Sequence, residues 1–82
     1  MSTTSTPPLV DVRPDLAAGR EPFSKIMQTA RTIGEGRSFL LLSPIEPEPL
    51  YGVLGRMGFT HETEPLGDEG FRVTFTRQGV PQ

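Results

Sequence analysis

The sequence contains no cysteine and no tryptophan, and His61 is its only histidine. Without cysteine, the chain has no disulfide, no thiolate zinc site, no iron–sulfur ligand and no thiol nucleophile. A single histidine also leaves no pair of imidazoles for a metal motif and only one base for a hydrolytic triad. We therefore expect no catalytic triad, no metal and no cofactor, and we favour a protein that is not an enzyme.

Excess positive charge and long apolar runs are missing as well. The chain has 8 basic and 10 acidic residues and a net charge of −2, whereas nucleic acids and anionic membranes attract basic surfaces. Its longest apolar run covers residues 39–42, and its N-terminus lacks the basic and apolar segments of a signal peptide. The sequence therefore predicts a cytoplasmic protein that binds neither nucleic acid nor membrane.

A chain of 82 residues is long enough for one small domain, which buries only about 60% of its unfolded surface. We expect residues 9–78 to form this domain. Residues 1–8 are rich in Ser, Thr and Pro and are expected to be a disordered tail, and residues 79–82 a frayed end.

The first half of the domain predicts a strand, a helix and a second strand. Residues 9–13 alternate in polarity, which predicts a strand that ends at Pro14, and a loop follows. Pro22 suits the first position of a helix, and apolar residues at helical spacing from Phe23 to Ile33 extend that helix over residues 22–33. Residues 38–43 are almost continuously apolar, which predicts a central strand covered on both faces.

The second half predicts a short helix and a hairpin. Prolines within residues 44–49 prevent regular structure until one of the later prolines begins a helix, and this helix is expected to end near Met57 and Gly58. Residues 59–64 and 71–77 alternate and are joined by a loop rich in Gly and acidic residues. The order βαβαββ predicts an α+β fold, a two-layer α/β sandwich in which two helices cover one face of a four-stranded sheet.

In this arrangement one face of the sheet has nothing in the chain to cover it. Either Leu40 and Leu42 or Phe39 and Leu41 point away from the helices. Apolar residues on such a face predict an interface with a second copy or another protein. The alternative is that aliphatic stems of nearby arginines cover these leucines, the candidates being Arg13, Arg72 and Arg77.

The junction between the first strand and the first long helix is the principal candidate site. Charged residues gather there: Asp11, Arg13, Asp15, Arg20 and Glu21. Ligands bind beyond the carboxyl ends of parallel strands, and the N–H groups of a helix N-terminus attract anions. Arg20 is a candidate to clamp a carboxylate, phosphate or other oxyanion. The alternative is that these residues form ordinary surface ion pairs.

A second group lies around the start of the second helix. Glu46, Glu48 and Tyr51 offer carboxylates and a hydroxyl to a cation or a basic partner. The simpler interpretation is that Glu48 complements the helix dipole and Tyr51 packs on the helix surface. His61, on an expected strand beside Glu62, lacks the second imidazole or thiol that a transition-metal site requires.

Several segments taken together resemble the TusA/SirA-like superfamily of small sulfur carriers, and within it an uncharacterised bacterial TusA-like family. The segments, which span residues 9–77, are 11–13, 21–23, 36–42, 47–51, 58–59 and 70–77. The resemblance implies a mixed sheet of strand order 1-2-4-3 with the last strand antiparallel to the others. It also implies a loose association with nitrogen-oxide or redox metabolism.

Sulfur carriers of this superfamily have a Cys-Pro-x-Pro motif where the first helix begins. The corresponding residues here are Gly19, Arg20, Glu21 and Pro22, so glycine replaces the cysteine that carries the persulfide. We therefore expect a TusA-like binding or adaptor module without sulfur-carrier activity, with a protein partner or a homodimer. The alternative is a sensor or minor enzyme that binds a small anion through Arg13 and Arg20.

Overall fold

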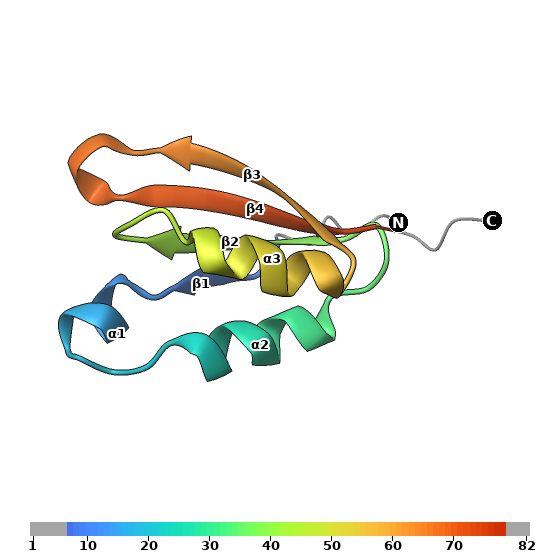
Figure 1. Ribbon diagram of the computed structural model, residues 1–82, viewed down its shortest axis with the longest axis horizontal. Helices are drawn as coiled ribbons and strands as arrows, with labels where there is room; N and C mark the ends of the chain where they lie inside the picture. Colours follow the sequence, from blue (N-terminus) through green and yellow to red (C-terminus); the bar gives the residue numbers. More distant parts are fainter. Residues whose placement is uncertain (1–6, 79–82) are drawn as a thin grey trace, which may run out of the picture.

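The computed structural model describes residues 7–78 (Figure 1). The elements in chain order are β1 (Leu9–Asp11), α1 (Arg13–Ala17), α2 (Phe23–Thr32), β2 (Ser38–Ser43), α3 (Glu48–Arg56), β3 (Phe59–Pro65), the 3-10 turn η1 (Gly67–Glu69) and β4 (Phe71–Arg77). In this part of the chain no helix is both long and apolar enough to cross a membrane.

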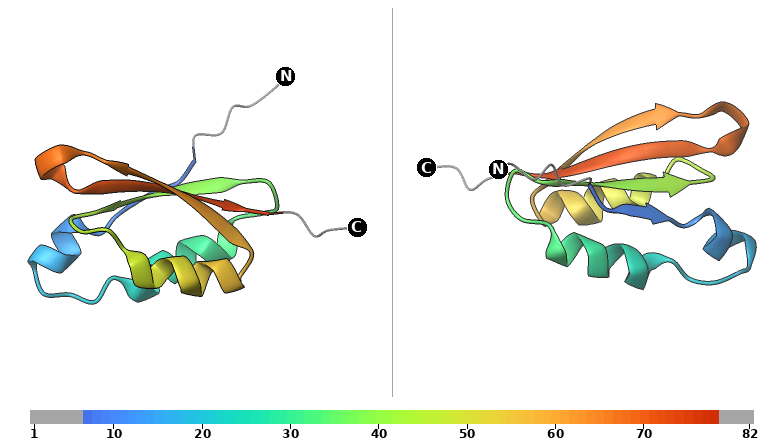
Figure 2. Two further views of the ribbon diagram at one scale, coloured as in Figure 1. Left: turned by 45° about the horizontal axis from the view of Figure 1, so that its top comes forward. Right: turned by 180° about the vertical axis from the view of Figure 1, so that it is seen from behind.

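The four strands form one mixed sheet in the order β1-β2-β4-β3. β1 and β2 are parallel, and β4 is antiparallel to both β2 and β3. The long helices α2 and α3 lie side by side on one face of the sheet (Figures 1 and 2). The predicted α+β fold and the strand order implied by the family resemblance are both confirmed.

The described residues 7–78 form three α-helices where two were expected. The first strand ends at Asp11 rather than Arg13, and the segment predicted as a loop begins with the short helix α1. Pro14, predicted to end the strand, lies instead in the first turn of α1, where a missing N–H costs no hydrogen bond. The N–H of Leu16 donates to the carbonyl of Val12, which closes this first turn (3.0 Å).

The core lies between the sheet and the two long helices. Along β2 the residues alternate, so that Phe39 and Leu41 are buried and Leu40 and Leu42 are half-buried on the outer face. The helices therefore cover one face of this strand, and an interface at Leu40 and Leu42 on the other face stays a prediction. The ring of Phe39 stacks on Phe75 with centroids 5.3 Å apart. The remaining core side chains are Val10, Val12, Ile26, Ala30, Ile33, Leu54, Phe59 and Val73.

Arg77, at the end of β4, joins the C-terminal ends of both long helices to the sheet. Its guanidinium donates to the carbonyls of Ile33 (2.6 Å), Met57 (3.1 Å) and Ala30 (3.2 Å) and lies 4.7 Å from the centroid of the Phe59 ring. These carbonyls belong to the helix ends, which leave acceptors without intrahelical donors. Arg77 therefore lies on the helix side of the sheet and does not cover Leu40 or Leu42.

Gly70 lets the turn before β4 approach the end of β2. It is buried, and its φ is +102°. A Cβ atom at this position would lie 2.2 Å from the carbonyl oxygen of Ser43 and 2.9 Å from the Cα of Pro44. This close approach of two backbones requires glycine. It holds the β3–β4 turn beside the carboxyl end of β2, where the candidate site lies.

Candidate functional site

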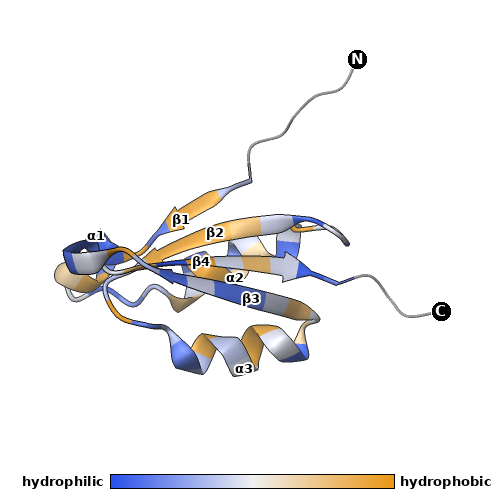
Figure 3. Ribbon diagram, turned by 90° about the horizontal axis from the view of Figure 1, so that it is seen from above, coloured by the Kyte–Doolittle hydropathy of each residue, from blue (hydrophilic) through white to orange (hydrophobic). Residues whose placement is uncertain are grey.

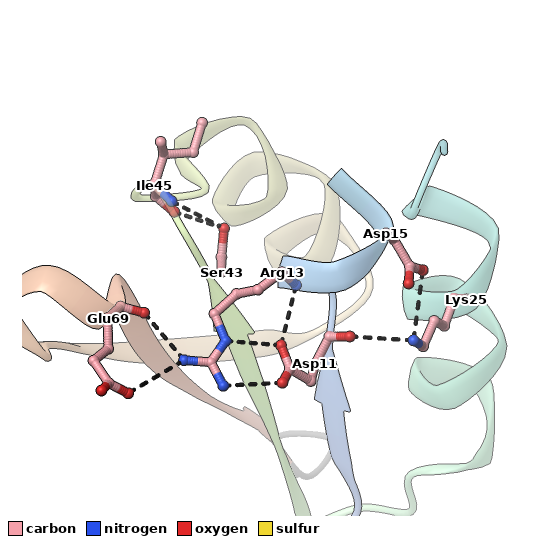
Figure 4. A network of polar contacts seen from close by, with 7 residues as sticks. All are labelled: Asp11, Arg13, Asp15, Lys25, Ser43, Ile45 and Glu69. Atoms are coloured by element: carbon pink, nitrogen blue, oxygen red, sulfur yellow. Dashed lines mark hydrogen bonds and ion pairs between the residues drawn. The ribbon is translucent and has the colours of Figure 1, made fainter. Parts of the chain in front are cut away.

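The polar side chains of the principal candidate site meet where β1 and β2 end. Because these strands are parallel, their carboxyl ends share one edge of the sheet. Asp11 ends β1, Arg13 begins α1, and the turn η1 approaches from the other side (Figure 4). We call this region the carboxyl edge and define it by Asp11, Arg13, Asp15, Leu16, Phe23, Lys25, Ile45 and Glu69.

Asp11 and Arg13 form a two-point ion pair at the centre of the carboxyl edge. Nε and Nη2 of Arg13 each lie 3.0 Å from a different carboxylate oxygen of Asp11, and the backbone N–H of Arg13 donates to the same carboxylate (3.0 Å). The hydrogen bond from the guanidinium is the main reason why the pKa of Asp11 is lowered. A carboxylate held in this way stays ionised and is unsuited to donate a proton at neutral pH.

Arg13 also connects α1 to the β3–β4 turn. Its Nη1 donates to the backbone carbonyl of Glu69 (3.2 Å) and lies 3.7 Å from the Glu69 carboxylate. Asp11 and Arg13 were predicted from the sequence, whereas Glu69, which is 56 residues beyond Arg13, was not. Only the strand register, which brings η1 to the end of β2, could reveal that contact.

Asp15 contacts two further basic side chains at the same edge. Lys25 of α2 approaches the carboxylate of Asp15 (3.5 Å) and donates to the backbone carbonyl of Asp11 (3.2 Å). Arg20 contacts Asp15 at 3.5 Å, and its side chain remains 64% exposed. Lys25 was not predicted to belong to this site, because it follows Asp11 by 14 residues and lies on a different element.

The N-terminus of α2 is capped by Glu21. The Glu21 carboxylate accepts hydrogen bonds from the backbone N–H groups of Phe23 and Ser24, the latter at 3.2 Å. These are the N–H groups that the sequence analysis offered to a bound anion. The pairing of Asp11 with Arg13 and of Asp15 with Arg20 thus matches the alternative of local ion pairs, and anion binding by Arg20 stays a prediction.

Exposed apolar side chains border this ion-pair network. Leu16 of α1 is 39% exposed, Phe23 of α2 is 44% exposed, and Ile45 in the loop after β2 is 66% exposed. The Ser43 hydroxyl donates to the carbonyl of Ile45 (2.7 Å), and the Ile45 side chain extends away from this contact (Figure 4). Phe23 was expected in the buried stripe of its helix, but it is exposed, whereas the stripe residues Ile26, Ala30 and Ile33 further along are buried.

The second candidate group lies between α3 and β3. The ring of Tyr51 stacks on His61, with centroids 3.6 Å apart and an angle of 3° between the planes. Its hydroxyl shares a hydrogen bond with Thr63 and donates to Glu46 (3.2 Å). Burial raises the pKa of Tyr51. Glu48 lies in the first turn of α3, where its charge complements the helix dipole.

The second group therefore brings together Glu46 and Tyr51, as the sequence analysis proposed, and adds His61 and Thr63. Alternation along β3 places these two residues on the face that α3 covers, and this was the available sign of their contact with Tyr51. Within residues 7–78, no three histidine, aspartate or glutamate side chains are grouped so that they could hold a metal ion.

Comparison with known proteins identifies one family. Residues 9–77 match the family described as "Uncharacterized conserved protein (DUF2249)". No curated protein and no solved structure shows a significant match to the chain. Because the family match extends over nearly all of the folded domain, the chain belongs to the DUF2249 family.

Proposed function

We propose that this protein is a non-catalytic binding module that docks a partner protein at its carboxyl edge. The observation that carries the proposal is the exposure of Leu16, Phe23 and Ile45 around a network of paired charges. Exposed apolar side chains beside satisfied polar groups are typical of protein interfaces, which combine apolar anchors with a polar rim. The fourth large apolar side chain that is strongly exposed in residues 7–78 is Leu9, on the outer face of β1.

The charges of the carboxyl edge favour docking over catalysis. Asp11 and Asp15 are each held by basic side chains, and Glu21 is occupied by the N-terminus of α2. A general acid or base needs a pKa near neutrality, whereas the pKa of Asp11 is shifted downward. The network therefore suits a rigid support that holds α1, α2 and the β3–β4 turn in fixed positions.

The proposal includes a relationship to the TusA/SirA-like carriers. The strand order β1-β2-β4-β3 is the one that the resemblance implies, and α2 and α3 stand where it expects two helices, with α1 as an addition. Gly19 stands at the position of the carrier cysteine and adopts a positive φ of +75°. Since glycine has no thiol, the module would keep the docking function of the TusA/SirA-like fold without the chemistry of sulfur transfer.

Paired surface variants test this proposal. The double variant Phe23→Ser with Ile45→Ser removes apolar anchors from the carboxyl edge, and Leu9→Ser is the matched control on the outer face of the sheet. Affinity capture from the protein's own host should yield a partner of fixed stoichiometry that the double variant loses and the control keeps. Loss of the partner with Leu9→Ser alone would instead place docking on the outer face, beside Leu40 and Leu42.

A further inference from the structure

β3 is an edge strand with one unpaired side. Within residues 7–78 it pairs with β4 only and lies at the end of the strand order (Figure 1). At seven residues it is much longer than β1, the three-residue strand at the opposite edge. Thr60, His61, Glu62, Glu64 and Pro65 are all exposed. A long exposed edge of this kind is a template for a further strand.

The hydrogen-bond register identifies the backbone groups that face this free side. The N–H of Gln78 donates to the carbonyl of Gly58, and the N–H of Leu66 donates to the carbonyl of Gly70, both at 2.8 Å. In an antiparallel pair, hydrogen-bonded residues alternate with residues whose N–H and C=O groups point the other way. The even-numbered residues of β3 therefore bond to β4, and the odd-numbered residues, including His61 and Thr63, face the free side.

Contacts on the helix side hold these two residues in place. The His61 ring stacks on Tyr51, and the Thr63 hydroxyl is bonded to the Tyr51 hydroxyl. Pro65 also follows the register, because its nitrogen lies at an odd position and no bond to β4 is lost. The free side is thus a preorganised row of donors and acceptors, which lowers the entropic cost of binding a strand.

The charges on β3 select the kind of strand that can pair there. Glu62 and Glu64 are exposed on the outer face, and Figure 3 shows β3 as hydrophilic over most of its length. An antiparallel pairing of all seven residues with a second copy would set Glu62 directly against Glu62 of that copy, which is unfavourable. Glu64 pairs with Arg72 of β4, whereas the residue opposite Glu62 is the uncharged Thr74.

We propose that the free edge of β3 binds, by strand addition, an extended segment of a partner protein with lysine or arginine at alternate positions. The basic side chains would lie on the outer face beside Glu62 and Glu64, and the residues between them would lie beside His61 and Thr63. This surface is separate from the carboxyl edge and does not depend on the function proposed for that edge.

A synthetic heptapeptide of alternating threonine and lysine, acetylated and amidated, is the direct probe. Added to the full chain, it should slow amide hydrogen exchange at His61 and Thr63, as measured by NMR. The amide of Glu62 is already bonded to β4 and should change little. The same peptide methylated at alternate backbone nitrogens keeps its charge but loses its strand donors, so it should not protect these amides.

Charge reversal tests the selectivity. Glu62→Lys should weaken binding of the lysine peptide about ten-fold, because an attractive cross-strand pair becomes repulsive. Glu35→Lys changes the net charge equally at an exposed position in the α2–β2 loop and should leave the affinity unchanged. NMR spectra of both variants establish that they remain folded.

Three results would overturn the proposal. The first is absence of saturable binding at millimolar peptide, and the second is equal weakening by Glu62→Lys and Glu35→Lys, which would indicate non-specific attraction. The third is protection of the His61 and Thr63 amides in the peptide-free protein that disappears on dilution. That result would mean that a second copy, rather than a basic segment, occupies the edge.

Discussion

Replacing Arg77 tests the energetic account of the fold most sharply. One guanidinium donates three hydrogen bonds to carbonyls at the ends of α2 and α3 and lies over the ring of Phe59. Arg77→Met keeps an aliphatic stem of similar length but removes all three donors and the charge. The variant should fold to the same structure with a lower free energy of unfolding.

The size of the effect follows from these contacts. Hydrogen bonds to charged groups contribute about 1.5–3 kcal/mol each, and the cation over the aromatic ring adds about 0.5–1 kcal/mol. The three bonds share one partly exposed group, and water can replace some of them, so their contributions do not sum. We expect Arg77→Met to lower the free energy of unfolding by about 3 kcal/mol. In a domain of this size that corresponds to a Tm lower by about 12–24 °C.

Urea unfolding followed by circular dichroism gives the measurement, with the midpoint shifted and the m value unchanged. Arg77→Lys retains the charge with fewer donors and should lose about half as much stability. Arg56→Met, at the exposed end of α3, removes an equal charge and should cost less than about 0.5 kcal/mol. If Arg77→Met and Arg56→Met unfold at the same urea concentration, the proposed role of Arg77 is refuted.

Three further predictions follow from the site and the turns. The pKa of Asp11 is lowered in the folded protein, so the stability that its pairing provides is complete above its ordinary pKa of about 3.9 and is lost as the pH falls below that value. Asp11→Asn should therefore be less stable than the parent protein at pH 7 in thermal melts. This difference in stability should vanish near pH 2. The pKa of Tyr51 is raised, so the stability that the neutral Tyr51 hydroxyl provides is complete below pH about 10 and is lost above it. Absorbance titration should show a late-ionising tyrosine. Tyr51→Phe should flatten the fall in Tm above pH 10. Gly70→Ala should lower the free energy of unfolding by at least about 3 kcal/mol, because the added Cβ would collide with the backbone. Gly67→Ala, where φ is +66° and the space is open, should lower it by only about 1–2 kcal/mol. Equal losses of stability in urea unfolding would argue against the collision.

The sheet was predictable because polarity patterns and turn residues agree along most of the chain. Residues 38–43 and 71–77 were predicted with the bounds that the structure has, since apolar or alternating runs bounded by glycine and proline have few other interpretations. The segment 13–17 was missed because Pro14 stops a strand and starts a helix equally well. Choosing between these roles requires the hydrogen bond from the N–H of Leu16 to the carbonyl of Val12, which is not visible in the residue pattern.

The candidate site was predictable only in part. Asp11 and Arg13 are close in sequence, so their proximity could be inferred, and the parallel strands indicated the edge on which they lie. The contact with Glu69 depends on the register of β4 against β2. The exposure of Phe23 could not be predicted either, because an apolar stripe indicates which face of a helix is buried but not how far along the helix the sheet covers that face.

Native mass spectrometry of the protein purified gently from its own host is the measurement that tests the central claim most directly. The account predicts a complex with a protein partner at fixed stoichiometry, with no small molecule bound to the chain, and loss of that complex in the double variant of Phe23 and Ile45. A stoichiometric small anion or metal ion on the chain, retained in that variant and lost in Arg20→Ala, would contradict the account and support an anion sensor or small enzyme.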